Sequence, residues 1–257
     1  PDRWNYDALM ARKAEIGTLK FTREYMCVPI STGTSLFNPE YLDSAKNKDL
    51  ILKPMRREGF KYFVGVDPAI STDGDYNVIT VIEMDENENK RVVYIDRAKN
   101  VQFRENIQKV KLINSMFRPE VVLFETNTFA KSFTQELRQV ADINVHDFNT
   151  TRRKKQEIIL NLQMTLENKK IHFPYGNEES RRVTSALIEE MSMFAITDNG
   201  KFEGIGAHDD MVMSLALANA ATYQASEAFI LLDDLDIFGS APTASPTRPR
   251  GFMGLNF

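Results

Sequence analysis

The chain has 257 residues, of which 42% are hydrophobic and 26% are charged, a composition typical of globular proteins. Its formal net charge of -4 at pH 7 argues against a protein that coats nucleic acid through overall basicity, so any such contact must use local basic patches. Cys27 is the only cysteine, which excludes intramolecular disulfides and cysteine-based zinc sites and favours a reducing compartment. No apolar run approaches the roughly 20 residues that span a bilayer, and no signal-peptide pattern opens the sequence.

Residues 1–58 have no dominant hydrophobic period, and we interpret them as a linker segment that packs on a neighbouring domain. We expect a helix around residues 4–20, an extended piece over residues 21–30 and a short helix near residues 39–46. The chain begins with Pro1 rather than methionine, so we interpret it as a fragment of a longer protein.

From residue 61 the hydrophobic pattern becomes regular and predicts strands. The runs "KYFVGVD" at 61–67 and "YNVITVIEM" at 76–84 are short and apolar, and "NENKRV" joins the second to "RVVYID" at 91–96, which predicts an antiparallel hairpin. Apolar residues at helical spacing follow over 102–117, and "EVVLFETN" at 120–127 is typical of a buried strand.

The second half of the chain alternates helices with short extended pieces. The pattern predicts helices around residues 131–140, 155–168 and 178–194, a strand at 144–148 and an extended link at 171–175. The sequence "MFAITDNGKFEGIG" predicts a hairpin that turns at Asn199-Gly200, because both residues tolerate a positive φ. A last, strongly apolar helix closes the domain near Tyr223.

The order of these elements predicts an α/β fold with a mixed sheet. Three antiparallel strands are followed by parallel strands, and helices flank the faces. We place this domain at residues 59–225. After residue 226 the composition becomes acidic and apolar and then rich in Ser, Thr, Pro and Gly, so residues 226–257 are expected to form a flexible tail.

Two acidic residues stand where predicted strands end. Asp67 follows "YFVGV" and Glu125 follows "VVLF". If the two strands are parallel neighbours, both carboxylates lie at the same carboxyl edge of the sheet, where open α/β sheets usually bind ligands. The alternative is that each acid merely begins a polar loop.

A second acidic pair, Asp209 and Asp210, directly precedes the apolar helix "MVMSLALANA". The simplest interpretation is helix capping, since an aspartate accepts an unpaired N–H and a first-turn charge favours the helix dipole. A buried helix at the sheet edge would also carry both carboxylates towards Asp67 and Glu125.

Such a cluster of carboxylates needs protons or cations. Two unit charges about 4 Å apart repel by about 4 kcal/mol at an effective dielectric constant of 20. All-oxygen ligands suit Mg²⁺ or Mn²⁺ rather than zinc. Two such ions can activate water and stabilise the leaving oxygen of a phosphodiester.

The motifs "FVGVDPA", "LFETN" and "GAHDDMVMSLALA", in this order, resemble the C-terminal nuclease of tailed-phage terminase large subunits, which has an RNase H/integrase-like fold. The resemblance covers about residues 60–225. The upstream "FTREYMCVPISTGTSLF" is similar to the segment that joins a terminase ATPase domain to its nuclease, which would make residues 1–58 that linker. Each motif is short, and their order and spacing carry the specificity.

The resemblance implies a nuclease that cleaves double-stranded DNA during phage genome packaging with two Mg²⁺ or Mn²⁺ ions. Asp67 matches the first-strand ligand, which can bridge two ions. Glu125 matches the fourth-strand acid, and Asp209 matches the acid of the "HDD" motif. Asp210 would be a further ligand or would support the others.

Three residues near these motifs are weaker candidates. In some members of the family an acid shortly after the first strand contributes, which points to Asp73 or Asp75, although "STDGDY" is also an ordinary turn sequence. His208 neighbours the acid pair and would orient a carboxylate or shuttle a proton, unless it is simply a polar residue before a helix.

The resemblance also implies partners that this chain lacks. No P-loop pattern GxxxxGK[ST] occurs, so we expect no ATPase activity from the chain alone. The implied partners are double-stranded DNA, the terminase ATPase domain, the portal protein and the small terminase subunit, with no membrane involved. The implied location is the procapsid in the host cell cytoplasm.

Local basic patches are the candidate DNA-binding residues. They are Arg152, Arg153, Lys154 and Lys155 in "TTRRKK", Arg181 and Arg182 at the start of a helix, and "KPMRR" at residues 53–57. Contacts from such residues to phosphates give little sequence specificity. Each patch is equally interpretable as a solvated basic surface.

Two other functions stay open at this point. The same fold serves junction resolvases and transposase-type nucleases, which would prefer branched DNA over linear duplex. The acidic and apolar tail instead suggests a module that docks on a portal or motor partner and has weak intrinsic nuclease activity.

Overall fold

The computed structural model describes residues 5–27, 35–68, 76–126, 134, 136–138, 143–197, 199–205 and 208–224. Within these residues the helices are α1 (Tyr6–Ile16), α2 (Thr18–Glu24), α3 (Pro39–Ser44), α4 (Phe103–Phe117), α6 (Arg152–Glu167), α7 (Glu178–Ser192) and α8 (Asp210–Gln224). The strands are β1 (Lys46–Asn47), β2 (Lys61–Asp67), β3 (Tyr76–Met84), β4 (Lys90–Lys99), β5 (Val121–Glu125), β6 (Val145–Phe148), β7 (Ile171–Pro174), β8 (Phe194–Ile196) and β9 (Phe202–Gly204). None of these described helices has the length and apolarity to cross a membrane.

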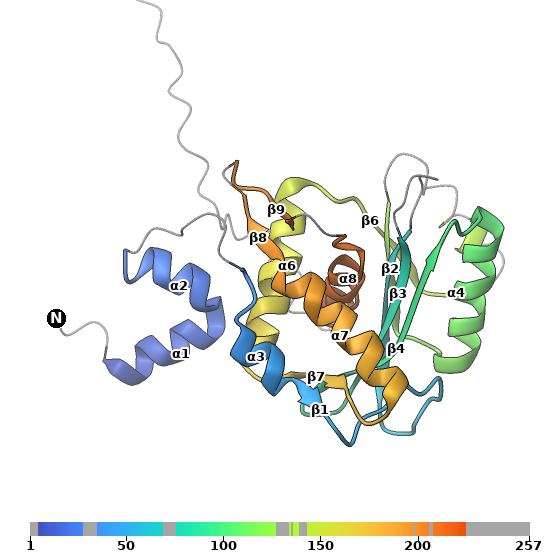
Figure 1. Cartoon of the computed structure of the whole chain (residues 1–257), viewed down its shortest axis with the longest axis horizontal. Coiled ribbons are helices and arrows are strands. Elements are labelled where there is room, and N and C mark those ends of the chain that lie inside the picture. Colours follow the sequence, from blue (N-terminus) through green and yellow to red (C-terminus); the bar gives the residue numbers. More distant parts are fainter. Residues whose placement is uncertain are drawn as a thin grey trace, which may run out of the picture.

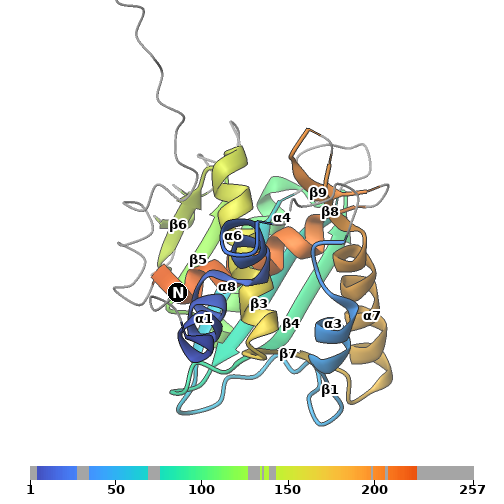
Figure 2. The ribbon, with the colours of Figure 1, turned by 90° about the vertical axis from the view of Figure 1, so that its left-hand side faces the viewer.

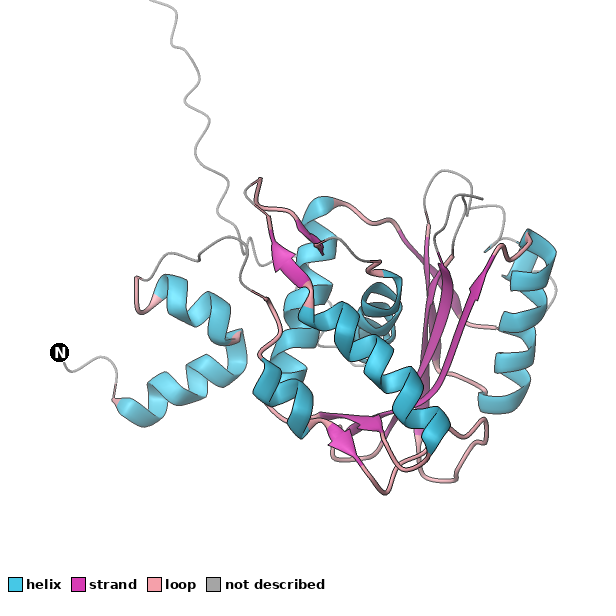
Figure 3. Cartoon of the chain, viewed as in Figure 1, coloured by secondary structure: helices cyan, strands magenta, loops and turns pink. Residues whose placement is uncertain are grey.

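In the described part of the chain, a seven-stranded sheet in the order β1-β7-β4-β3-β2-β5-β6 forms the centre of the domain, with helices on both faces (Figures 1 and 3). Strands β2, β3 and β4 are an antiparallel meander, whereas β5 runs parallel to β2 and β6 runs parallel to β5. This confirms the predicted mixed sheet. Strands β8 and β9 form a separate hairpin with Gly200 at its turn, where φ is +66°.

The sheet extends further than the sequence predicted. Residues 171–174, expected as an extended link, form β7, which runs parallel to β4 and to β1. The run is only four residues long, so it has too few positions to distinguish a strand from a connection.

The amino-terminal prediction was wrong in detail. The helix expected over residues 4–20 is interrupted at Gly17, whose φ of +80° a residue with a side chain rarely adopts. The segment expected to be extended from residue 21 begins as helix, since α2 continues to Glu24. The predicted helix at 131–140 and the predicted tail at 226–257 lie largely or wholly outside the described residues.

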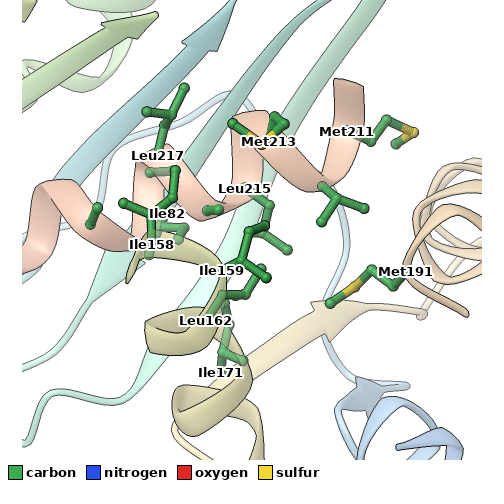
Figure 4. Close-up of a cluster of buried hydrophobic side chains, with 14 of the residues drawn as sticks. Ile82, Ile158, Ile159, Leu162, Ile171, Met191, Met211, Met213, Leu215 and Leu217 are labelled. Atoms are coloured by element: carbon green, nitrogen blue, oxygen red, sulfur yellow. The ribbon is translucent and has the colours of Figure 1, made fainter. Parts of the chain in front are cut away.

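Two hydrophobic clusters pack against the two faces of the sheet. One lies between the sheet and α4 and includes Ile107 and Phe117. The other lies between the sheet and α6, α7 and α8, and Figure 4 shows Ile159 of α6 beside Leu215 of α8 within it. Figure 2 shows α8 lying across the strands, with α6 outside it. Helix α8 is therefore an interior element, sandwiched between the sheet and other helices.

The second half of the segment predicted as a linker contributes to this core. Leu36, Phe37 and Leu42 belong to the cluster that includes α8, and the backbone N–H of Leu36 donates to the carbonyl oxygen of Phe194 at 2.8 Å. Helices α1 and α2 lie at the outer side of the domain (Figure 1). The attachment of this segment to another domain stays a prediction.

Candidate functional site

Asp67 and Glu125 end adjacent parallel strands. Residues 63–66 of β2 pair in register with residues 121–124 of β5, and one further step in the same register sets Asp67 beside Glu125. The expectation that these two strands are parallel neighbours is therefore confirmed. Both carboxyl groups stand at the carboxyl edge of the sheet.

The two carboxyl groups also face the same side of the sheet. Side chains alternate between the two faces along a strand. Phe63 and Leu123 belong to the cluster that packs against α8. Asp67 is four residues beyond Phe63 and Glu125 is two beyond Leu123, so both acids face α8.

Helix α8 rests directly on the backbone of β2. A β-carbon on Gly65 would lie 2.1 Å from the carbonyl oxygen of Ser214 and 2.4 Å from the amide nitrogen of Ala218, so only glycine permits this approach. Ser214 Oγ lies 3.0 Å from the Gly65 carbonyl oxygen and 2.9 Å from Thr80 Oγ1, within hydrogen-bond distance of both. These contacts fix the helix on β2 and β3.

The acids at the start of α8 are held by residues from other elements. Lys155 Nζ of α6 donates to Asp209 Oδ2 at 2.8 Å. The backbone N–H of Tyr76, at the start of β3, donates to Asp210 Oδ2 at 3.1 Å. His208 Nδ1 lies 3.7 Å from the same Asp210 oxygen, and its role in orienting a carboxylate or shuttling a proton stays a prediction.

The carboxylates from β2, β5 and α8 interact electrostatically. Burial raises the pKa of Asp67 well above its ordinary value, and charge repulsion and a hydrogen bond from Glu125 raise it further. The charges of Asp210 and Asp209 act in the same direction. A hydrogen bond between two carboxyl groups requires a shared proton, so the cluster already demands positive charge.

The donor set fits a hard divalent cation, because it consists of carboxylate oxygens. Among the described residues, however, no three acidic, histidine or cysteine side chains converge closely enough to form a metal cage as they stand. The ion pair with Lys155 draws Asp209 to one partner, and the bond from Tyr76 draws Asp210 to another. Asp73 and Asp75 lie outside the described residues.

One acid at this site, Glu190 of α7, is not among the residues predicted from the sequence. Its Oε2 accepts from the backbone N–H of Met211, in the first turn of α8, at 2.9 Å. This backbone N–H is therefore capped by a side chain of another helix rather than by Asp209 or Asp210. Burial raises the pKa of Glu190 to about 7. The sequence does contain a signal: an acid near the carboxyl end of α7 opposes the helix dipole and lies on the same face as buried Leu187.

A family model described as the terminase RNaseH-like domain matches residues 64–221. The chain belongs to this family. The matched range contains Asp67, Glu125, Asp209 and Asp210, as well as Glu190. A search of curated proteins gives no match.

Solved structures of phage terminases share the fold of this terminase RNase H-like domain. The large terminase nuclease from thermophilic phage G20c with bound magnesium has a TM-score of 0.55 and 21% identity, covering 75% of this chain and 98% of that nuclease. The large terminase from a second thermophilic bacteriophage has a TM-score of 0.63 and 15% identity, covering 86% of this chain and 53% of that protein. The HK97 bacteriophage large terminase has a TM-score of 0.55 and 11% identity, covering 85% of this chain and 51% of that protein.

The basic start of α6 lies at the carboxylate edge of the terminase RNase H-like domain. Lys155 reaches this edge through its ion pair, which has 2.8 Å between nitrogen and oxygen. Arg152 Nη2 donates to the carbonyl oxygen of Asn199 at 2.5 Å, and Gln156 Nε2 donates to that of Gly200 at 3.1 Å. The first turn of α6 therefore contacts both the acidic cluster and the β8–β9 turn.

The other two basic residues of this turn have surface positions. Arg153 Nε donates to Glu157 at 2.9 Å along the helix. Lys154 Nζ lies 5.8 Å from the ring centroid of Phe148. Both side chains are exposed and lie on the same helical turn as Lys155.

The remaining basic patches lie elsewhere. Arg181 and Arg182 are exposed near the start of α7, about 12 to 14 Å along the helix from Glu190 at 1.5 Å per residue. Arg57, the last residue of "KPMRR", pairs with the buried carboxylate of Glu83 near the opposite end of β3. These residues do not share the carboxylate edge with α6.

Proposed function

We propose that the chain is a divalent-metal-dependent endonuclease that hydrolyses double-stranded DNA during phage genome packaging. The observation that carries the proposal is the approach of Asp67 and Glu125, from neighbouring strands, to the acidic start of α8. Membership of the terminase family supports it. Structures of the G20c terminase nuclease with bound magnesium and with bound cobalt, at TM-scores of 0.55 and 0.52, add support for a divalent ion.

Asp67, Glu125 and Asp209 would hold Mg²⁺ or Mn²⁺, with two ions in the full site. Asp210 would be a further ligand or would hold the others in place. The ions, when bound, would supply activation of water and stabilisation of charge on the phosphate oxygens. The protein supplies a rigid mount, because β2, β5 and α8 are buried elements fixed against each other.

The first turn of α6 would bind the DNA backbone beside the acids. The amino terminus of a helix attracts phosphate through its N–H groups and its dipole. Arg152, Lys154 and Lys155 add positive charge there, next to an acidic cluster that would otherwise repel DNA. Such contacts act on phosphates and give little sequence preference.

Cleavage of supercoiled plasmid in Mg²⁺ or Mn²⁺ tests the proposal. Asp67→Ala, Glu125→Ala and Asp209→Ala should each abolish cutting. Glu105→Ala changes an exposed acid on α4, which covers the opposite face of the sheet, and should cut like the unsubstituted protein. Full activity in all three site variants would contradict the proposed chemistry. Comparison of linear duplex with a four-way junction separates a packaging nuclease from a junction resolvase.

We further propose that the physiological partners are double-stranded DNA, a terminase ATPase domain, a portal protein and a small terminase subunit, in the cytoplasm of a host cell. The chain spans about half of the two longer large terminases, 53% of that from the second thermophilic bacteriophage and 51% of that from HK97. Capture of a portal protein by a chain that binds no divalent ion would instead favour a docking module.

A further inference from the structure

We propose that Glu190 is a positioning residue, which fixes the first turn of α8 and thereby the carboxylates of Asp209 and Asp210. The inference rests on the proposed function, because it concerns the same acidic site. Glu190 lies on α7, outside the strands and helix that carry the candidate ligands. Its role would be to hold those ligands rather than to bind a metal.

One carboxylate of Glu190 joins three elements. Its Oε2 accepts from the backbone N–H of Met211 in α8 at 2.9 Å, and its Oε1 accepts from Arg97 Nη2 in β4 at 2.7 Å. The residue is only 5% exposed, so water competes little for either bond. When it is ionised, the Glu190 carboxylate also favours the dipole of α8.

The contacts of Glu190 continue as a closed ring back to Asp210. The guanidinium of Arg97 lies 3.8 Å from the centroid of the Tyr76 ring. The backbone N–H of Tyr76 donates to Asp210 Oδ2 at 3.1 Å. Asp210 adjoins Met211, which Glu190 caps, so the start of α8 is held from β3 on one side and from α7 on the other.

The same geometry argues against Glu190 as a direct ligand. Each of its carboxylate oxygens accepts a described hydrogen bond, one from Met211 and one from Arg97. The Arg97 guanidinium, ion-paired to Glu190, would repel a second cation on that oxygen. Two acceptor oxygens are needed to serve both donors. A glutamine has one carbonyl oxygen and would serve only one of them.

Calorimetric titration with Mn²⁺ tests the role of Glu190. The variants compared with the unsubstituted protein are Glu190→Ala and Glu190→Gln. Glu189→Ala, at the exposed neighbouring position, is the matched control. Loss of a residue that orients metal ligands typically costs about 10- to 100-fold in metal affinity. We expect a loss in that range for Glu190→Ala, a smaller loss for Glu190→Gln and no change for Glu189→Ala. Urea unfolding establishes that each variant is folded, and Glu190→Gln answers the question if Glu190→Ala does not fold.

The outcomes separate the two proposals. The positioning role would be overturned if the unsubstituted protein binds Mn²⁺ and a folded Glu190 variant binds it with the same affinity. The proposed metal site would then stand without the positioning role. If Glu190 has a purely structural role, its variants should have a lower free energy of unfolding and an unchanged Mn²⁺ affinity. Absence of Mn²⁺ binding in the unsubstituted protein would overturn the metal-dependent function, and the positioning role with it.

Discussion

Gly65 of β2 lies directly beneath Ser214 of α8, and a β-carbon at Gly65 would stand 2.1 Å from the Ser214 carbonyl oxygen. Gly65→Ala should therefore push α8 off the sheet and lower the free energy of unfolding by about 3 kcal/mol, at the upper end of overpacking costs. Urea denaturation measures this change. Gly59→Ala is the comparison: its β-carbon would meet no atom within 4 Å, so only its positive φ opposes the change, at a cost of about 1 kcal/mol. Equal losses in the two variants would contradict the contact with α8.

The acidic cluster should cost the protein stability. Because the pKa of Asp67 is raised in the folded state, the fold loses stability relative to the unfolded chain as pH rises above the ordinary carboxyl range. Asp67→Asn removes this charge and should raise the free energy of unfolding at neutral pH, without divalent ions, by on the order of 1 kcal/mol. The advantage of the variant should shrink as pH falls through the ordinary carboxyl range to about pH 3, where the aspartate is largely protonated in the unfolded chain as well as in the folded state. A variant less stable than the parent at pH 7 would contradict this account.

Divalent-ion binding should release protons. Asp67 and Glu125 share a hydrogen bond that requires a proton, and a metal ligand must be ionised. The apparent Mn²⁺ affinity should therefore rise with pH through the raised pKa of Asp67. Calorimetry in two buffers with different ionisation enthalpies counts the protons released. A binding enthalpy that is independent of the buffer below neutral pH would refute the shared proton.

Lys155 and Lys154 should differ in their effect on metal binding. Lys155 pairs with Asp209 and competes with a cation for it, so Lys155→Met should increase Mn²⁺ affinity by up to about fivefold, the worth of a partly exposed ion pair. Both Lys155→Met and Lys154→Met should weaken DNA binding and reduce its salt dependence by about one counterion. Only the first should change metal affinity. Weaker Mn²⁺ binding in Lys155→Met would show that Lys155 supports Asp209 rather than competing for it.

A buried lysine far from the acids should make stability depend on pH in the opposite direction. Lys90 is 4% exposed, donates to Asn219 Oδ1 at 2.9 Å, and has its pKa lowered by burial to about 7. Between about pH 7 and 10.5 the unfolded chain therefore binds more protons at this position than the folded one, so stability gains with rising pH. The free energy of unfolding of the parent minus that of Lys90→Met should rise across this window, at no more than about 1.4 kcal/mol per pH unit. A flat difference would mean that Lys90 stays charged.

The strands that carry the candidate site could be predicted because they are continuous apolar runs. Strand β2 is buried at five successive positions and β3 at seven, so the pattern defines both their length and their ends. The buried run of β2 stops at Asp67, and the buried run of β5 stops at Glu125. Strand β7 could not be predicted in the same way, because the pairing that makes it a strand is made with β4, far away in the chain.

Contacts between side chains that are far apart in the chain could not be predicted from the sequence. Lys155 and Asp209 are 54 residues apart, and no periodicity relates the start of α6 to the start of α8. The charge of Lys155 and of its neighbours predicts a basic patch, whereas its contact with an acid results from helix packing. Glu190 was missed because a single acid in an amphipathic helix is ordinarily interpreted as part of the solvated face.

The position of α8 at the end of the described chain has a consequence for synthesis. A nascent chain that has emerged only as far as β9 contains Asp67 and Glu125 but neither Asp209 nor Asp210. In that chain Gly65 also lacks the helix that covers it. The acidic cluster is complete only after the last described helix has left the ribosome and inserted between the sheet and α6. A partly translated or prematurely terminated chain would thus lack the proposed metal site, which would protect the DNA around it from an unfinished enzyme.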